Sequence, residues 1–231
     1  MSHTAEVRAP GVRQAQKQRT RRALLDAALA LLAEQSLGSL GLREVTRAAG
    51  VAPAAFYRHF RDIPDLGVAL VDEALDSLHG TIRTALAATL PTAGRAAGPR
   101  GGGDRRIDAA SDERIEAAVE LIAALVREYP AHVRFIAREQ HGGVAAVRAA
   151  ITGQLALFAA EVADALAAAP ESAGWRRADL LMLAGLYVDH MVMTASALLA
   201  AGPEEAGRVQ VVRVARQRMR LISLGRRHWL D

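Results

Sequence analysis

The amino-acid sequence predicts an all-α protein of about nine helices, with an N-terminal three-helix helix-turn-helix domain followed by a larger C-terminal helical domain. Hydrophobic residues make up 51% of the 231 residues, and most of them are Ala and Leu, which favour helices. Aromatic residues make up only 4%, and β-branched residues are sparse. Apolar residues recur at helical spacing, and no run alternates apolar and polar residues as a half-buried strand does.

The first helix is expected over Gln14–Ser36, after a polar lead formed by residues 1–12. Its apolar residues recur at helical spacing: Leu24, Leu25, Ala28, Leu31 and Leu32. The first turns of this helix read QKQRTRR, so its basic residues gather at one end.

Two short helices should follow, over Leu42–Ala49 and Pro53–Phe60. Gly50 tolerates the left-handed conformation that ends the first of them. Pro53 suits the first position of the second, where its missing N–H costs nothing. Phe56 and Phe60 stand at i and i+4 of the second short helix and should form its inward face.

The remaining helices are separated by breaks rich in Gly and Pro. A fourth helix, capped by Asp62 and Asp65, should extend to about Leu90, and Pro91–Arg106 is expected to be a flexible loop. Further helices are expected over Ser111–Tyr129, Pro130–His141, Val144–Ala168, Trp175–Ala201 and Glu204–Trp229. We therefore expect a helix-turn-helix domain over residues 13–76 and a larger helical domain over residues 77–231.

The positive charge of the chain lies in its first quarter. Residues 1–61 contain ten Lys and Arg residues against four Asp and Glu residues, which is a net charge of +6. Because the whole chain carries +4, residues 62–231 carry −2. Such an excess is typical of a nucleic-acid footprint, although a solvated charged surface would look the same from charge alone.

The two short helices and the turn between them have the parts of a helix-turn-helix, whose second helix enters the major groove. The outer face of that second helix carries small, aromatic and basic side chains that suit base edges and phosphates. The expected DNA-binding residues are Thr20, Arg22, Arg43, Pro53, Ala54, Tyr57, Arg58 and His59. The alternative is a three-helix packing unit with no ligand.

The string LREVTRAAGVAPAAFYRHFRD resembles the DNA-binding signature of the TetR family of transcription regulators. In this resemblance Gly50 is the turn glycine, Phe56 and Phe60 are core positions, and Tyr57 and His59 contact phosphates. The chain departs from the family pattern at two caps and at the start of the fourth helix. Gly41 and Ala52 replace capping hydroxyl residues, and Asp62-Ile63-Pro64 replaces a stretch that often holds a Lys.

The chain is most similar to the branch of FabR-like and DesT-like repressors of unsaturated fatty acid synthesis. The similar stretches are Gln16–Leu29, Phe56–Glu73, the R-x-x-x-RE-x-x-G element Arg134–Gly142, and Arg218–Gly225. This resemblance implies a dimeric repressor that is controlled by a long-chain acyl-CoA. The expected ligand-binding residues are Phe135, Arg138, Arg148, Leu155, Phe158, Tyr187 and Met191. A plain core and an ion-paired surface are the alternatives for these residues.

The remaining expectations concern partners and other functional classes. A palindromic operator requires two copies, and we place their contact on the last two helices, where Ala184, Gly185, Ala195 and Ser196 allow close approach.

The chain lacks Cys and shows no metal-ligand or catalytic motif, so we expect no enzyme, no cofactor and a cytoplasmic protein. Leu180–Ala201 approaches the length of a membrane span, but Asp189 and His190 lie at its middle. An architectural DNA-binding protein and a membrane-associated protein remain the alternatives to a ligand-gated regulator.

Overall fold

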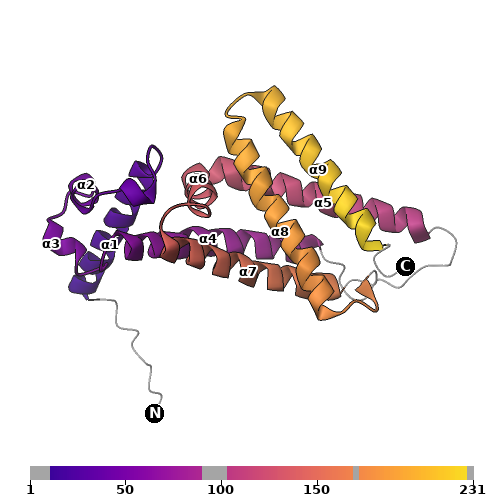
Figure 1. Cartoon of the computed structure of the whole chain (residues 1–231), viewed down its shortest axis with the longest axis horizontal. Helices are drawn as coiled ribbons and strands as arrows, with labels where there is room; N and C mark the ends of the chain where they lie inside the picture. The colour runs from indigo at the N-terminus through magenta and orange to yellow at the C-terminus, as the bar shows by residue number, and fades with distance from the viewer. Residues whose placement is uncertain (1–10, 90–102, 169–171, 228–231) are drawn as a thin grey trace, which may run out of the picture.

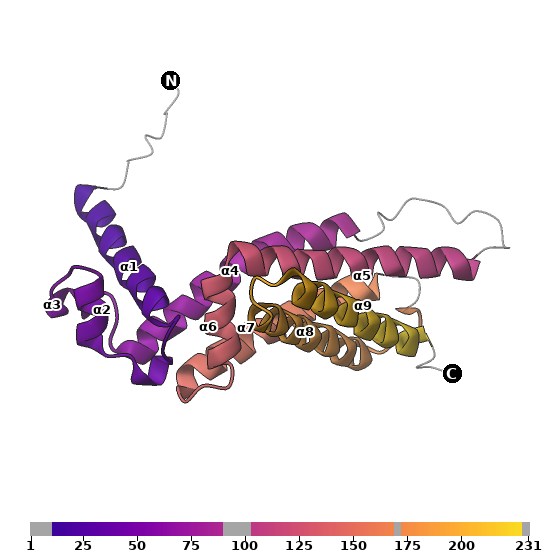
Figure 2. The ribbon, with the colours of Figure 1, turned by 90° about the horizontal axis from the view of Figure 1, so that it is seen from above.

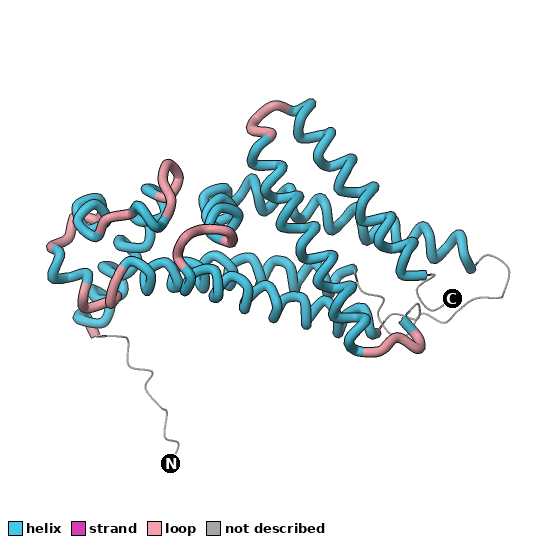
Figure 3. Tube along the Cα trace, in the orientation of Figure 1, coloured by secondary structure: helices cyan, strands magenta, loops and turns pink. Residues whose placement is uncertain are grey.

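The computed structural model describes residues 11–89, 103–168 and 172–227, and over these residues the chain is all-α, as the sequence predicts (Figure 3). A 3₁₀ turn, η1 (Leu37–Ser39), accompanies nine α-helices in this described part of the chain. The helices are α1 (Val12–Leu31), α2 (Leu42–Ala48), α3 (Pro53–Phe56), α4 (Ile63–Thr89), α5 (Gly103–Glu128), α6 (Pro130–Glu139), α7 (Ala145–Ala167), α8 (Arg177–Ala200) and α9 (Glu205–Arg227).

Helices α1, α2 and α3 form a small unit at one end of the molecule (Figure 1). Its core is built from fully buried Leu24, Val45 and Phe56, and the Phe56 and Phe60 rings lie 5.6 Å apart. Gly50 has a φ of 66°, the left-handed conformation that the sequence predicts for the turn between α2 and α3.

The larger part of the molecule is a bundle of α4, α5, α7, α8 and α9. Helix α4 leaves the N-terminal unit and continues into this bundle, where it runs beside α7 (Figures 1 and 2). Helix α8 packs against both α7 and α9, and α5 packs against α9. Residues 76 and 77, the expected domain boundary, both lie inside α4, so a continuous helix joins the two parts.

Helix α6 connects the two parts a second time. It lies between the N-terminal unit and the bundle in both views (Figures 1 and 2), and it packs against α1, α4 and α8. Phe135 is buried in the core that α6 shares with α1 and α4, whereas Val133 is buried against α5 and α8. Because α6 is buried on both sides, a displacement on one side is transmitted to the other.

Three predicted boundaries are wrong. Helix α1 ends at Leu31 instead of Ser36, because the chain turns and then forms η1, which buries Leu37. Helix α3 ends at Phe56, and the chain continues to Phe60 in tight turns. Helix α5 begins at Gly103, so the predicted loop is wrong for residues 103–106. The sequence DRRIDAA that follows Gly103 suits a helix, with acids placed near the N-terminus. Residues 91–102 of that loop lie outside the described residues.

Two helices, α7 and α8, contain windows with mean hydropathies of 1.3 and 1.4, enough for a membrane span by length and composition only. A core helix of a soluble protein passes the same test. Asp189 is exposed in the middle of α8, and His190 beside it is buried and contacts the carbonyl oxygen of Ala215 on α9. These two polar residues therefore fit a helix that packs against α9, where the buried His190 has a hydrogen-bonding partner.

Candidate nucleic-acid interface and apolar cavity

Helix α3 divides its side chains between the protein core and the solvent. Phe56 and Phe60 are buried, whereas Tyr57 keeps 64% of its surface exposed and Arg58 is also exposed. Pro53 and Ala54 at the start of the helix are exposed as well. An aromatic ring that projects beside a cation at the tip of a domain is a surface suited to a partner.

A hollow of about 400 Å³ lies between the first turns of α1 and the end of α3. Its lining is polar and basic: Gln16, Lys17, Thr20, Ala55, Arg58 and His59. Burial, then the positive charges of Lys17, Arg21 and Arg58, lower the pKa of His59 below its ordinary value. The Nδ1 atom of His59 is buried without a hydrogen-bond partner. Converging cations around an unpartnered imidazole form a site that fits a phosphate group.

Lys17 and Gln16 belong to this hollow although the sequence analysis did not single them out. The basic run QKQRTRR was the available signal, but it does not say which of its side chains face α3. Arg21 lies over the Phe60 ring, with its guanidinium carbon 5.0 Å from the ring centroid. Arg22, an expected phosphate ligand, lies on the other side of α1 and forms ion pairs with Asp26 (3.0 Å) and Glu73 (2.8 Å).

The other expected contacts lie around this surface. Arg43 is exposed in the first turn of α2, and Thr20 donates from Oγ1 to the Gln16 carbonyl at 3.1 Å. Gly41 and Ala52 occupy the N-caps of α2 and α3, and neither helix has a side-chain cap hydrogen bond. Both departures from the capping pattern that the sequence analysis noted are therefore present in the structure.

A cavity of about 90 Å³ opens in the bundle between α5, α6, α7 and α8. Its lining is apolar: Leu75, Ile122, Leu125, Val126, Val133, Ile136, Ala137, Leu155, Phe158, Val188, Met191, Val192 and Ala195. Three of the expected ligand-binding residues, Leu155, Phe158 and Met191, are among them. An apolar lining of this kind suits a hydrocarbon chain.

The other four expected ligand-binding residues lie elsewhere. Phe135 is buried in the core shared with the N-terminal unit, and Tyr187 packs into a cluster with side chains of α5 and α9. Burial raises the pKa of Tyr187. Arg148 donates from Nη1 to the Gly142 carbonyl at 2.5 Å, and Arg138 is bonded to α1, as described next. The structure thus brings together the apolar half of the expected site and not its arginines.

Arg138 and Glu139, at the end of α6, hold the segment that follows α1. Arg138 donates from Nη1 to the carbonyl oxygens of Leu32 (3.1 Å) and Gln35 (2.7 Å). The buried carboxylate of Glu139 accepts a hydrogen bond from the Leu37 amide at 2.9 Å. We call these two residues and their three bonds the α6 clamp. Glu139 belongs to the R-x-x-x-RE-x-x-G element of the sequence, but it was not among the expected site residues.

Gly142 leaves the space that the Glu139 carboxylate of the clamp occupies. A Cβ atom at this position would lie 2.3 Å from Glu139 Oε2 and 3.2 Å from Glu139 Cα. Because real Cβ atoms do not approach other atoms so closely, any larger residue would displace the carboxylate. The glycine of the RE-x-x-G element therefore has a steric explanation.

Residues 24–70 match the model of the family described as "Bacterial regulatory proteins, tetR family". This match spans the core of the helix-turn-helix and the start of α4. Residues 24–70 therefore resemble the helix-turn-helix domain of that family, and the all-helical fold around them is TetR-like. The described residues contain no group of three or more His, Asp or Glu side chains that would hold a metal ion.

Solved structures share the fold along nearly their whole length. The fatty acid degradation regulator FadR from Bacillus halodurans is 14% identical with a TM-score of 0.64, and the match covers 92% of this chain and 96% of that one. FadR from Bacillus subtilis, in complex with stearoyl-CoA, is 12% identical with a TM-score of 0.60 and coverages of 87% and 96%. AibR, in complex with isovaleryl coenzyme A and operator DNA, is 17% identical with a TM-score of 0.58 and coverages of 85% and 96%. At these identities the likeness shows the fold.

Proposed function

We propose that this protein is a homodimeric repressor whose affinity for a palindromic operator is controlled by a long-chain acyl-CoA, in control of fatty acid metabolism. One observation carries the proposal. Helix α6 lines the apolar cavity with Val133, Ile136 and Ala137, and the two residues that directly follow hold the N-terminal unit through the α6 clamp. A ligand in the cavity therefore acts on the same helix that positions the DNA-binding domain.

On DNA, the exposed face of α3 enters the major groove. Tyr57 and Arg58 reach base edges and the neighbouring backbone, while the hollow formed with Lys17 and His59 receives a phosphate. Arg43 contacts the backbone from the start of α2. Residues that combine base contacts with phosphate contacts give both affinity and sequence preference.

The effector enters the apolar cavity. At about 90 Å³ the cavity is far smaller than the roughly 300–1,000 Å³ of typical ligand sites, so the bundle has to open for an acyl chain. Each buried methylene contributes about 0.8 kcal/mol, enough for a long chain to offset this opening. That two structurally similar regulators were solved with acyl-CoA ligands supports the same class of effector here.

Opening the cavity changes the position of α6. Because Arg138 and Glu139 are bonded to residues 32–37, a shift of α6 moves the end of α1 and with it α3. In a dimer this motion changes the distance between the two recognition surfaces, which must match a half-site spacing of about 34–36 Å. The effector controls DNA affinity through its preference for one of the two arrangements.

We propose that the dimer contact lies on α8 and α9. Large apolar side chains remain exposed there: Leu181, Met182, Leu186, Met193, Val209, Leu221 and Leu224. Met182, Leu186 and Met193 recur on one face of α8, and Gly185 and Ser196 beside them allow close approach. Ala184 is buried within the protomer and Ala195 lines the cavity, so these two small residues contribute to the inside of the subunit.

The deciding experiment is an operator-binding titration in the presence of palmitoyl-CoA and oleoyl-CoA, with coenzyme A as the control. A change in operator affinity of tenfold, about 1.4 kcal/mol of coupling, is the expected result for at least one acyl-CoA. If neither changes the affinity by more than about twofold, worth only some 0.4 kcal/mol, the acyl-CoA proposal fails.

The dimer has its own test. Sedimentation of the purified protein should give a dimer at micromolar concentration, and Leu186→Glu should give a monomer because it places a charge in an apolar contact. A parent protein that sediments as a monomer would contradict the assembly proposed here. Native mass spectrometry of the same sample separates a ligand-gated regulator from an architectural protein, since an architectural protein needs no bound lipid.

A further inference from the structure

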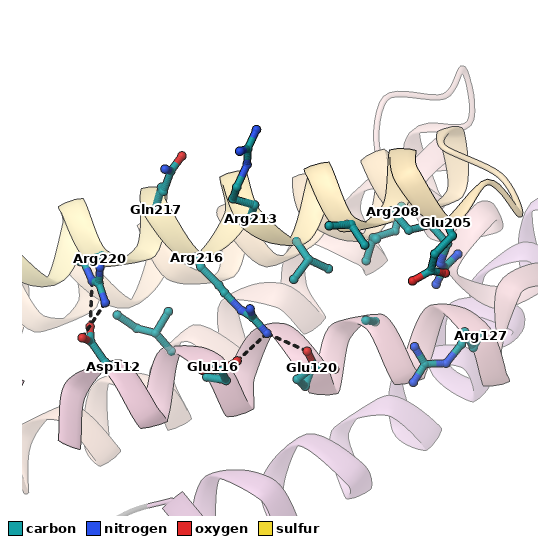
Figure 4. A pocket seen from close by; sticks show the side chains of 15 residues that line it. Asp112, Glu116, Glu120, Arg127, Glu205, Arg208, Arg213, Arg216, Gln217 and Arg220 are labelled. Atoms are coloured by element: carbon teal, nitrogen blue, oxygen red, sulfur yellow. Dashed lines mark hydrogen bonds and ion pairs between the residues drawn. The ribbon is translucent and has the colours of Figure 1, made fainter. Parts of the chain in front are cut away.

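A second hollow, of about 640 Å³, lies between α5 and α9 on the outside of the bundle (Figure 4). The apolar residues that line it are Ile115, Ala123, Leu198, Val209 and Val212. Its rims carry Arg side chains from both helices together with acids. The volume is in the range of small-molecule sites, and the combination of apolar lining residues and basic rims suits an organic anion.

The charges divide the groove into two ends. At one end, Arg216 of α9 pairs with Glu116 (2.6 Å) and Glu120 (2.8 Å) of α5, and Arg220 pairs with Asp112 (2.5 Å). Figure 4 shows these pairs as dashed lines that join the two helices. At this end, therefore, both arginines are paired with carboxylates of the same protomer.

The other end carries excess positive charge. Arg127 on α5 and Arg208 on α9 line it, and Glu205 is the acid beside them (Figure 4). Within the described ranges, neither Arg127 nor Arg208 forms an ion pair. Arg208 donates from Nη1 to the Gly202 carbonyl at a long 3.4 Å, and its Nη2 is buried without a partner. A guanidinium nitrogen removed from water without a partner is destabilising, and an anion would satisfy it.

This basic end shares a wall with the apolar cavity. On α5, Ile122 and Val126 line the cavity while their neighbours Ala123 and Arg127 line the groove. On α8, Ala195 lines the cavity and Leu198, one turn on, lines the groove. The partition between the two is therefore the contact of α5 with α8, and it includes two alanines.

We propose that the basic end of the α5/α9 groove, with Arg127 and Arg208, binds the phosphates of the nucleotide head of the effector. The acyl tail passes between α5 and α8 into the apolar cavity. This inference rests on the proposed function and deepens it, because it assigns the head to a different surface from the one that the sequence indicated. Arg138 and Arg148, expected from the sequence, donate to backbone carbonyls and are not among the groove residues.

The test is calorimetric titration of the full-length protein with coenzyme A, palmitoyl-CoA and palmitate. The variant is Arg127→Gln with Arg208→Gln. Its matched control, Arg177→Gln with Arg218→Gln, removes two exposed arginines that do not line the groove. Thermal unfolding of both variants checks that they are folded. We expect the groove variant to bind coenzyme A and palmitoyl-CoA about tenfold or more weakly, with palmitate binding unchanged and the control within about twofold of the parent.

Each outcome decides one proposal. If the groove variant binds palmitoyl-CoA as the parent does, the groove assignment is wrong while the acyl-CoA effector stands. If the parent binds coenzyme A through Arg127 and Arg208 but takes up neither palmitoyl-CoA nor palmitate, the groove stands and the acyl effector fails. A parent protein that binds neither coenzyme A nor palmitoyl-CoA overturns the groove assignment as well.

Discussion

Helices α3 and α6 are both short and begin with Pro, and each has a buried Phe with an Arg two or three residues after it, yet the two arginines are used in opposite ways. In α3, Phe56 fills the core while Arg58, in the turn after the helix, faces solvent beside other cations. In α6, Phe135 is buried too, but Arg138 is bonded to two backbone carbonyls. An arginine with fixed internal partners holds the fold, whereas one among other cations is available to an external anion.

The same criterion separates the two ends of the α5/α9 groove. Arg216 and Arg220 already have carboxylate partners, and they join two helices of the same protomer. Arg127 and Arg208 form no ion pair within the described residues, and Glu205 is the acid that lines the groove beside them. The difference between structural and binding arginines therefore lies in their partners and not in their position in the sequence.

The largest effect expected from this comparison is on stability within α3. Phe56→Ala leaves a cavity in the core of the N-terminal unit and should lower the free energy of unfolding by about 3–5 kcal/mol. Tyr57→Ala removes an exposed ring and should change it by less than about 0.5 kcal/mol. Denaturant unfolding of the two variants measures both values. If the two variants were equally destabilised, Tyr57 would be a core residue, and α3 would not have one buried face and one exposed face.

The next effect is on DNA binding. Arg58→Ala should weaken operator binding by about 1–3 kcal/mol if Arg58 reads a guanine, and it should leave stability nearly unchanged. Arg43→Ala, on the backbone side, should weaken binding to all sequences alike and lower the salt slope by about one charge. Fluorescence anisotropy with operator and random duplexes distinguishes the two. Parental affinity in both variants would show that α3 does not face the groove.

The turn and the short helix α3 of the N-terminal unit were predictable from the sequence, because the residues that define them lie close together in the chain. Gly50, Pro53 and the Phe56–Phe60 pair are few residues apart, and their spacing alone defines a turn followed by a short helix. The hollow that adds Lys17 required a contact between α1 and α3, which the basic run did not specify. Arg22 was expected on DNA, but its carboxylate partner Glu73 is about fifty positions away in the chain.

The ligand domain was less predictable because small rotations of its helices decide which side chains meet. Tyr187 and Met191 are one turn apart on α8 and differ by about 40° around its axis. That difference is enough for Met191 to line the cavity while Tyr187 packs against α5 and α9. The hydrophobic pattern of α8 is apolar on most sides, so it indicates burial without indicating direction.

A smaller effect is expected at the α6 clamp. Arg138→Ala removes two charge-assisted hydrogen bonds from a partly solvated site, which should cost about 1 kcal/mol. Hydrogen exchange should rise at the amides of residues 32–37, and the effect of palmitoyl-CoA on operator affinity should shrink while binding of palmitoyl-CoA persists. Arg134→Ala, one turn earlier on α6, is the matched control. If the effector response survives intact in Arg138→Ala, the clamp is only structural.

The smallest expected effect is a pH dependence at His59. Burial and the charges of Lys17, Arg21 and Arg58 hold the pKa of His59 below 6.5 in the free protein, so the imidazole is neutral at pH 7. The same shift means that the unfolded chain takes up the proton first, and this residue's contribution to stability is present above pH 6.5 and lost as the pH falls through the lowered pKa. A DNA phosphate in the hollow adds negative charge and raises that pKa again.

DNA binding should therefore be accompanied by proton uptake at His59, and operator affinity should rise as the pH falls from about 7.5 to about 5.5. One group binds at most one proton, so the increase stays below about tenfold per pH unit. His59→Gln keeps a polar side chain that does not titrate, and in this variant the pH dependence should be lost while the affinity at pH 7.5 stays close to that of the parent. Anisotropy titrations at fixed ionic strength give both curves. Identical pH profiles for the two proteins would place the phosphate away from His59, which would limit the nucleic-acid surface to the exposed side chains of α3.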